Sequence, residues 1–387
     1  MDLDAAILDA ARAGASDLHL EPGLPATMRV DGSLRRVGAP VAGAGLRTAL
    51  RGLLGPDGWQ DFRARGSADL SRTLAGVRCR VAVLRSARGV GAAIRLLSSR
   101  QVSLASLNIH PDIADLARAR HGLVLVTGPT GSGKSTTIAA LVNEINQHQA
   151  RHIVTLEQPI EHALVPKRSL IRQREVGRDT PSFEQGLMDV LREDPDVIVV
   201  GEMRWPATIR LTLSAAETGH LVFSTVHASS CAEALGRIVA AFPAEEQSAV
   251  RAMLADALVG VVAQKLLYRE DLGFRVPSLE VLTATDAVRA VVRNGAAHKV
   301  GQMLETNADA GMWSRQRYAR WLSQRKSWSR PTVPGTSSAP DLPTVREPAV
   351  QAPRPAVPAR RKSAAAEPGV LVLDGYDDDL ASVLSEM

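Results

Sequence analysis

Short apolar runs recur in the middle of the chain and alternate with stretches of helical periodicity. The runs "GLVLVTG" (122–128), "HIVTL" (152–156), "DVIVV" (196–200) and "HLVFSTV" (220–226) contain few polar residues. Runs of this kind are typical of strands in a parallel sheet, because helices cover both faces of such a sheet. Residues 121–270 are therefore predicted to form an α/β domain.

Different patterns flank this region. Residues 1–101 begin with a helical pattern and continue as alternating strands, with Asp31-Gly32 as a two-residue hairpin signal. This predicts a small N-terminal α+β domain. Residues 102–120 are predicted to be a linker with a connecting helix, and residues 271–328 a mostly helical C-terminal subdomain.

The composition changes abruptly after Trp328, to Pro, Ala, Ser, Thr and Arg without apolar periodicity. Such a segment buries too little apolar surface to offset the entropy lost on ordering, so residues 329–387 are predicted to be a disordered tail. The last stretch, "GVLVLDGYDDDLASVLSEM", regains apolar spacing beside acidic residues. Its pattern fits a short docking helix and a merely solvated end equally well.

Composition and charge exclude few classes of binding partner. The net charge of +5 fits an anionic partner but does not identify one. Aromatic residues make up only 3% of the chain, and no Lys/Arg run lies in residues 121–270, so no direct nucleic-acid contact is expected. Cys79 and Cys231 are too few for a disulfide scaffold or a four-thiolate zinc site. No apolar run approaches the roughly 18 residues of a transmembrane segment, and a cytoplasmic location is expected.

A phosphate-binding motif follows the first apolar run. "GPTGSGKST" matches G-x-x-x-x-G-K-[ST] and leads from the strand "LVLVT" into the helix "TTIAALVNEIN". Backbone N–H groups of such a loop surround phosphate oxygens at a helix N-terminus, the lysine reaches the β- and γ-phosphates, and the serine ligates Mg²⁺. ATP and Mg²⁺ are therefore the expected cofactors, bound by Gly128, Pro129, Thr130, Gly131, Ser132, Gly133, Lys134, Ser135 and Thr136.

Three glutamates are candidates for the acidic groups of the reaction. Glu202 stands one residue beyond the place where an aspartate would usually end the strand "VIVV", so it is a candidate base for a lytic water. Glu157 and Glu161, in "TLEQPIE", are candidates for holding magnesium through water. An exposed loop or surface acid is the alternative at each position.

Together, four blocks resemble the type II/type IV secretion and twitching-motility ATPases, the GspE/PilT superfamily, and most closely its PilT/PilU retraction branch. The blocks are "GPTGSGKST", "TLEQPIE", "LREDPDVIVVGEMR" and "AAETGHLVFSTVH". Weaker similarity runs from "SDLHL" at residue 16 to about residue 325. The resemblance implies a PAS-like N-terminal domain followed by a RecA-like P-loop ATPase domain.

The resemblance also assigns roles to individual residues. It makes Glu202 the catalytic glutamate and His227 a sensor of the γ-phosphate, for which a core histidine is the alternative. It places Arg80 and Arg95 where relatives direct arginines onto the nucleotide phosphates. The sequence departs from the family pattern in three places: Gln158 replaces an acid next to Glu157, Trp205 follows "GEMR" in place of aspartate, and the strand "RVAVL" lacks the usual asparagine and phenylalanine.

The function implied by the resemblance is a homohexameric ATP-hydrolysing motor for type IV pilus retraction. It would lie in the cytoplasm, peripheral at the inner membrane, and act on a pilus platform protein. The segment "EVLTATDAVRAVVRNG" resembles the helix that retraction motors need. A secretion or plasmid-conjugation motor is the first alternative. The departures at Gln158 and Trp205 suggest a second, an accessory PilU-type copy that depends on a paralogous retraction ATPase.

Overall fold

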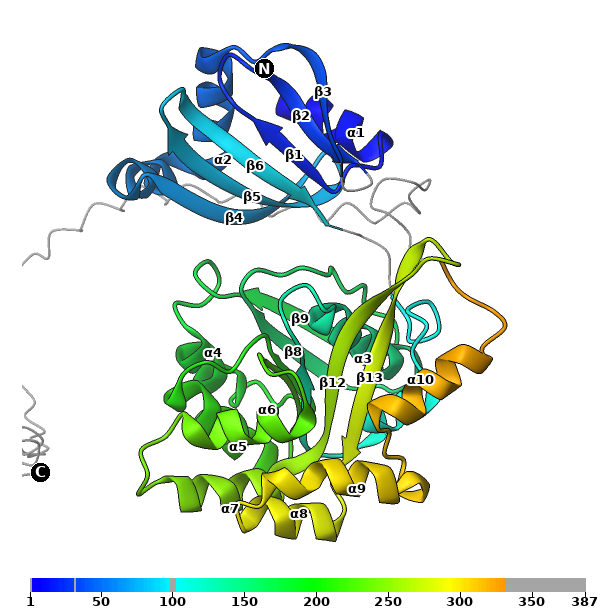
Figure 1. The fold of residues 1–387 in the computed structure, drawn as a ribbon. Coiled ribbons are helices and arrows are strands. Elements are labelled where there is room, and N and C mark those ends of the chain that lie inside the picture. The colour runs from blue at the N-terminus through cyan, green and yellow to red at the C-terminus, as the bar shows by residue number, and fades with distance from the viewer. Residues whose placement is uncertain (1, 31–32, 98–101, 331–387) are drawn as a thin grey trace, which may run out of the picture. The chain divides into compact units, whose positions relative to one another are not determined.

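The structure, a computed structural model, describes residues 2–30, 33–97 and 102–330 (Figure 1). Their strands form two sheets, and helices accompany both, which confirms a mixed α/β fold. Within these ranges no helix combines the length and the apolar character that crossing a bilayer requires. The predicted disordered tail from residue 331 onward lies outside the described residues, as do Asp31 and Gly32.

The first sheet has six antiparallel strands and follows helix α1 (Leu3–Arg12). The order is β3-β2-β1-β6-β5-β4. Val30 and Ser33 pair on either side of the predicted hairpin turn. The strands are β1 (Asp17–Leu20), β2 (Pro25–Val30), β3 (Ser33–Pro40), β4 (Ser67–Leu74), β5 (Val77–Ser86) and β6 (Gly89–Leu96).

Helix α2 (Gly43–Arg65) corrects the prediction that residues 1–101 continue as alternating strands after the first helix. The helix contains a kink at Gly55, where φ is 73°, next to Pro56. A Gly-Pro pair normally ends a helix. Here Leu50 before the kink and Phe62 after it are both buried in the core of the first sheet, so tertiary packing keeps the two halves together.

The second sheet has seven strands in the order β13-β12-β7-β11-β10-β8-β9. All neighbours are parallel except β12 and β13. The strands are β7 (Gly122–Thr127), β8 (His152–Glu157), β9 (Leu170–Glu175), β10 (Val197–Val200), β11 (Leu221–Val226), β12 (Leu258–Arg269) and β13 (Phe274–Thr283). Each of the four predicted apolar runs is thus confirmed as a parallel strand of this sheet.

Helices cover both faces of the second sheet (Figure 1). Val124 and Val126 of β7 point into a core with η1 (Pro111–Arg118), α3 (Lys134–His148) and α10 (Arg315–Gln324). Leu123 and Leu125 point into the opposite core. That core contains residues of α4 (Phe183–Val190), α5 (Pro206–Glu217), α6 (Cys231–Ala240), α7 (Gln247–Ala257), α8 (Asp286–Arg293) and α9 (Val300–Thr306). Burial on both faces explains why β7 reads as a continuous apolar run.

Strand β13 corrects the prediction for residues 271–328. Those residues were expected to be mostly helical, but Phe274–Thr283 pairs antiparallel with β12 at the edge of the second sheet. The apolar residues of β13 are interrupted by Pro277 and Glu280, which hides the strand in the sequence. The helices α8, α9 and α10 follow it, as the pattern predicted.

An aromatic cluster joins α10 to the start of η1. His110 lies 4.4 Å from Trp313 and 4.7 Å from Trp321, measured between ring centroids. The Tyr318 hydroxyl accepts the backbone N–H of His110 at 3.1 Å. Arg325 lies over the ring of Trp328 at 5.3 Å from its centroid. The end of the described chain is therefore packed against the segment that precedes η1.

Gly260, at a register shift in β12, has no room for a side chain. A Cβ there would lie 2.8 Å from the Leu282 carbonyl oxygen and 2.8 Å from a methyl carbon of Leu116. We expect Gly260→Ala to lower the free energy of unfolding by about 1–3 kcal/mol, measured by urea denaturation. Gly236→Ala, on the exposed face of α6 with open space around it, should leave stability equal or higher. Equal stability of the two variants would contradict this assignment.

Candidate functional site

The loop 128–133 connects β7 to α3, as the motif predicted. Gly128 has a φ of 156°, and a Cβ there would lie 2.3 Å from the Gln264 carbonyl oxygen. Gly133 adopts the left-handed conformation and caps the N-terminus of α3. Only glycine fits a backbone this crowded and this twisted. The loop therefore ends at the N-terminus of a helix, a position where backbone N–H groups and the helix dipole favour a bound anion.

Two polar groups of the loop are suited to receive a phosphate. The Lys134 ammonium donates to the carbonyl oxygens of Gly128 and Pro129, at 3.0 and 3.1 Å. Burial lowers the pKa of Lys134, while the nearby charges of Glu161 and Glu202 raise it. The buried hydroxyl of Ser132 has no hydrogen-bond partner among the described residues. Such a buried orphan group favours a bound ligand, so these residues fit a phosphate group.

Gln264 of β12 stabilises the same loop, although no sequence motif indicated this residue. Its side-chain amide donates to the Ser132 carbonyl at 2.6 Å and accepts the Thr137 hydroxyl at 2.7 Å. The side chain is 3% exposed. One signal was present in the sequence, because Gln264 is a polar residue within the apolar stretch "LVGVVAQKLL".

The structure brings Glu202 and His227 together at the ends of neighbouring strands. Strands β10 and β11 run parallel, with Val200 opposite Ser224. The loops that follow them place the His227 Nε2 atom 3.8 Å from a carboxylate oxygen of Glu202. Burial lowers the pKa of His227, and the charge of Lys134 acts in the same direction, while Glu202 opposes both. Arg204 also contacts Glu202, with 2.9 Å between Nε and Oε2.

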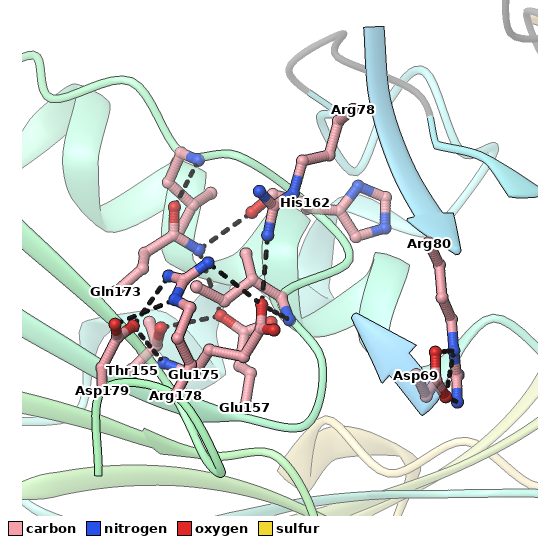
Figure 2. A network of polar contacts seen from close by, with 12 residues as sticks. Asp69, Arg78, Arg80, Thr155, Glu157, His162, Gln173, Glu175, Arg178 and Asp179 are labelled. Carbon is pink, nitrogen blue, oxygen red and sulfur yellow. Dashed lines mark hydrogen bonds and ion pairs between the residues drawn. The ribbon is translucent and has the colours of Figure 1, made fainter. Parts of the chain in front are cut away.

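Glu157 lies at the end of β8 and is held by two hydrogen bonds. Thr155 donates its hydroxyl at 2.7 Å, and Gln173 of β9 donates its amide at 3.1 Å (Figure 2). Burial raises the pKa of Glu157, and these two donors counteract the rise. Gln173 also donates to the carbonyl of His162 at 2.9 Å, so it shapes the loop after β8. Gln158, the departure from the family pattern, is exposed.

The loop after β8 also contacts the phosphate loop. The His162 Nε2 atom lies 3.2 Å from the Thr136 hydroxyl, and burial lowers the pKa of His162. Glu161 lines the same cavity as Lys134. Sequence reasoning named Glu161 and Thr136 but missed His162, which no motif singled out.

Arg80 and Arg95 are cross-strand neighbours on β5 and β6. Each is engaged by a carboxylate of its own sheet. Arg80 donates from Nε to Asp69 at 3.1 Å, as Figure 2 shows, and Arg95 donates from Nε to Asp17 at 3.0 Å. A different arginine, Arg78, donates to Glu175 of β9 at 3.1 Å (Figure 2).

One cavity of about 1600 Å³ collects most of these residues. Of the predicted site residues, its lining includes Arg80, Arg95, Thr130, Gly131, Gly133, Lys134, Ser135, Thr136, Glu157, Glu161, Glu202 and His227. Among the described residues, no three or more His, Cys, Asp or Glu side chains form a group that could hold a metal ion.

Comparison with known proteins finds relatives over most of the chain. The family described as "Type II/IV secretion system protein" matches residues 1–305. The type IV pilus retraction ATPase PilT of Pseudomonas aeruginosa is 41% identical over 314 residues, which cover 81% of this chain and 91% of the relative. A twitching motility protein of Neisseria gonorrhoeae is 43% identical over 287 residues, covering 74% and 77% of the two chains.

A solved structure shows the same architecture. The crystal structure of the pilus retraction motor PilT with bound ADP superposes with a TM-score of 0.74. The alignment has 36% sequence identity and covers 83% of this chain and 96% of the other. The phosphate loop, the paired strand ends with Glu202 and His227, and these matches lead to one conclusion: the chain belongs to the type II/IV secretion system protein family, the superfamily of GspE and PilT.

Proposed function

We propose that this chain is an ATP-hydrolysing motor that powers type IV pilus retraction. One observation supports it most: the chain is 41% identical to a PilT retraction ATPase over 91% of that relative, and it contains a complete phosphate-loop motif. The reaction is transfer of the γ-phosphoryl group of ATP to water. Work is obtained because binding and hydrolysis change the conformation of each subunit.

In this proposal the phosphate loop binds and orients the triphosphate. The N–H groups of Gly128, of residues 130–133 and of the first turn of α3 would donate to the phosphate oxygens, and Lys134, which contacts two loop carbonyls, would reach the β- and γ-phosphates. Ser135 is the residue that would ligate magnesium, with Glu157 and Glu161 holding its water shell. Magnesium, when bound, neutralises the charge that develops on the phosphate oxygens.

Glu202 is the proposed base that orients and deprotonates the attacking water. Arg204, whose Nε atom lies 2.9 Å from Oε2 of Glu202, orients this carboxylate. His227, next to Glu202, is suited to detect the γ-phosphate, because a neutral imidazole can donate one hydrogen bond. Arg80 and Arg95 would leave Asp69 and Asp17 to contact the nucleotide phosphates.

The proposed assembly is a cytoplasmic homohexamer, peripheral at the inner membrane, that turns a pilus platform protein. Each subunit would pair a PAS-like domain (1–101) through a linker (102–120) with a RecA-like domain (121–270). Residues 271–328, in which helices α8, α9 and α10 come after strand β13, and a tail (329–387) would follow. Nucleotide bound between the first two domains would close them, and its release would open them again.

In a deletion strain we expect loss of twitching with pili retained on the surface, measured by motility assay and microscopy.

Two alternatives give different phenotypes in the same strain. Cells without pili would indicate an assembly motor, and normal twitching with a secretion or conjugation defect would indicate a motor of that kind. An accessory motor of PilU type would retract pili only when its paralogous ATPase is present. Purified protein that hydrolyses ATP alone argues against this last alternative.

The role of Glu202 is tested by Glu202→Gln. Loss of the base should lower kcat about 10²–10⁴-fold while ATP still binds, because the phosphate loop is unchanged. Lys134→Ala should instead abolish turnover by weakening phosphate binding. Phosphate release and equilibrium nucleotide binding measure the two effects. Glu246→Gln, on an exposed glutamate that pairs with Arg210, is the matched control and should behave as the parent. An unchanged kcat in Glu202→Gln contradicts the mechanism.

Gln264→Met tests the two hydrogen bonds by which Gln264 stabilises the phosphate loop. Methionine keeps the length of the side chain but leaves the Ser132 carbonyl and the Thr137 hydroxyl without their partner. An unsatisfied buried polar group costs about 1–3 kcal/mol, so we expect the Kd for ATP to rise about 5–150-fold. Gln302→Met, on an exposed position of α9, is the control. Unchanged affinity in Gln264→Met would show that the loop holds its conformation without these hydrogen bonds.

A further inference from the structure

The loop that carries His227 is fixed from two opposite sides. On one side, the Thr127 hydroxyl donates to the carbonyl oxygens of Val226 and Ala228, at 2.8 and 3.0 Å. Thr127 is the last residue of β7, directly before the phosphate loop. The two carbonyls flank His227, so this contact ties the histidine to the strand that ends in the nucleotide site.

On the other side the loop is held by Arg315, the first residue of α10. Its guanidinium donates from Nη2 to the Ser229 carbonyl at 2.8 Å and from Nη1 to the Ser278 carbonyl at 3.4 Å. Its Nε atom lies 3.7 Å from a carboxylate oxygen of Glu280. Arg315, 86 positions away from Ser229 in sequence, therefore joins the His227 loop to two residues of β13 through one planar side chain.

Glu280 extends these contacts of Arg315 to the start of α6. We call Arg315 and Glu280 together the clamp. Its second carboxylate oxygen accepts the backbone N–H of Cys231, the first residue of α6, at 2.9 Å. A carboxylate at a helix N-terminus satisfies a free amide and complements the helix dipole. Glu280 has only 13% of its side chain exposed, so its charge needs the partner that Arg315 supplies.

We propose that Arg315, together with Glu280, is a positioning residue for His227. This inference rests on the proposed ATPase function, and it assigns part of the nucleotide response to the C-terminal helix α10. Arg315 fixes the backbone two residues after His227, and the imidazole then stands 3.8 Å from Glu202. Small displacements of a reacting group have large effects on rate. Arginine suits the position because its rigid fork reaches several acceptors at once, whereas lysine offers one flexible ammonium.

The kinetic test compares Arg315→Ala with the parent and with a matched control. We expect kcat to fall about tenfold with KM changed less than about twofold, because the phosphate loop that binds ATP is untouched. The control is Arg317→Ala on the same helix. Arg317 also donates to two carbonyls, those of Met312 and Glu305, but it makes no contact with the His227 loop. It should keep the parental kcat.

A double-mutant cycle separates positioning from general destabilisation. If Arg315 acts through His227, Arg315→Ala should lower kcat much less in a His227→Ala background than in the parent. An equal loss in both backgrounds overturns the proposal. Arg315→Lys keeps one donor and should restore part of the rate, which also covers the case in which the alanine variant does not fold.

A measurement without turnover keeps this inference distinct from the proposed function. Hydrogen exchange of peptides covering residues 227–233 reports on the Cys231 amide that Glu280 accepts. Exchange should be faster in Arg315→Ala than in the parent and unchanged in Arg317→Ala. If the parent hydrolyses no ATP, the proposed function fails, and the exchange result still decides whether Arg315 holds the loop. Equal exchange in all three proteins overturns the clamp.

Discussion

Parallel pairing of four adjacent strands is the constraint on which the candidate site depends. Strands β7, β11, β10 and β8 are neighbours in the second sheet and run in the same direction, so their carboxyl ends share one edge. At this edge lie, in the same order, the phosphate loop, His227, Glu202 and Glu157, the last residue of β8. Residues as far apart in sequence as Gly128 and His227 therefore meet because of backbone pairing.

Side chains from the last strands of the sheet then refine this arrangement. Gln264 of β12 donates to the Ser132 carbonyl of the phosphate loop, and Glu280 of β13 accepts the Cys231 N–H at the start of α6. Both strands lie on the side of β7 away from Glu202. The residues that act on phosphate and the residues that support them thus come from different parts of the same sheet. A substitution in β12 or β13 can affect turnover without touching the nucleotide.

The sequence predicted those parts of the molecule that depend on local pattern. Strands buried on both faces read as apolar runs, and the phosphate loop needs glycines at fixed spacing, so both were recognisable. Helix α2 was not, because Gly55 and Pro56 break its local pattern, and burial of Leu50 and Phe62 in one core is what holds its two halves together. Strand β13 was missed because Pro277 and Glu280 interrupt its apolar residues.

Polar contacts between residues far apart in the chain could also not be predicted from the sequence. Nothing near Gln264 or Arg315 indicates that one bonds Ser132 and the other Ser229, since each pair lies far apart in the chain. At Arg80 and Arg95, by contrast, the sequence suggested a contact that differs from the one in the structure. Resemblance assigned them to phosphate, and the structure shows each with a carboxylate of its own sheet. Which partner an arginine selects depends on the conformation and the ligand, and a sequence specifies neither.

The placement of the tryptophans gives the molecule optical reporters of its own. Three of the five, Trp313, Trp321 and Trp328, surround the segment before η1 or pack near it, while Trp205 is 68% exposed three residues after Glu202. Their environments differ so much that a water-soluble quencher would dim Trp205 first. The unlabelled protein can thus report separately, by its ultraviolet emission, on the loop beside Glu202 and on the junction where α10 meets the segment before η1.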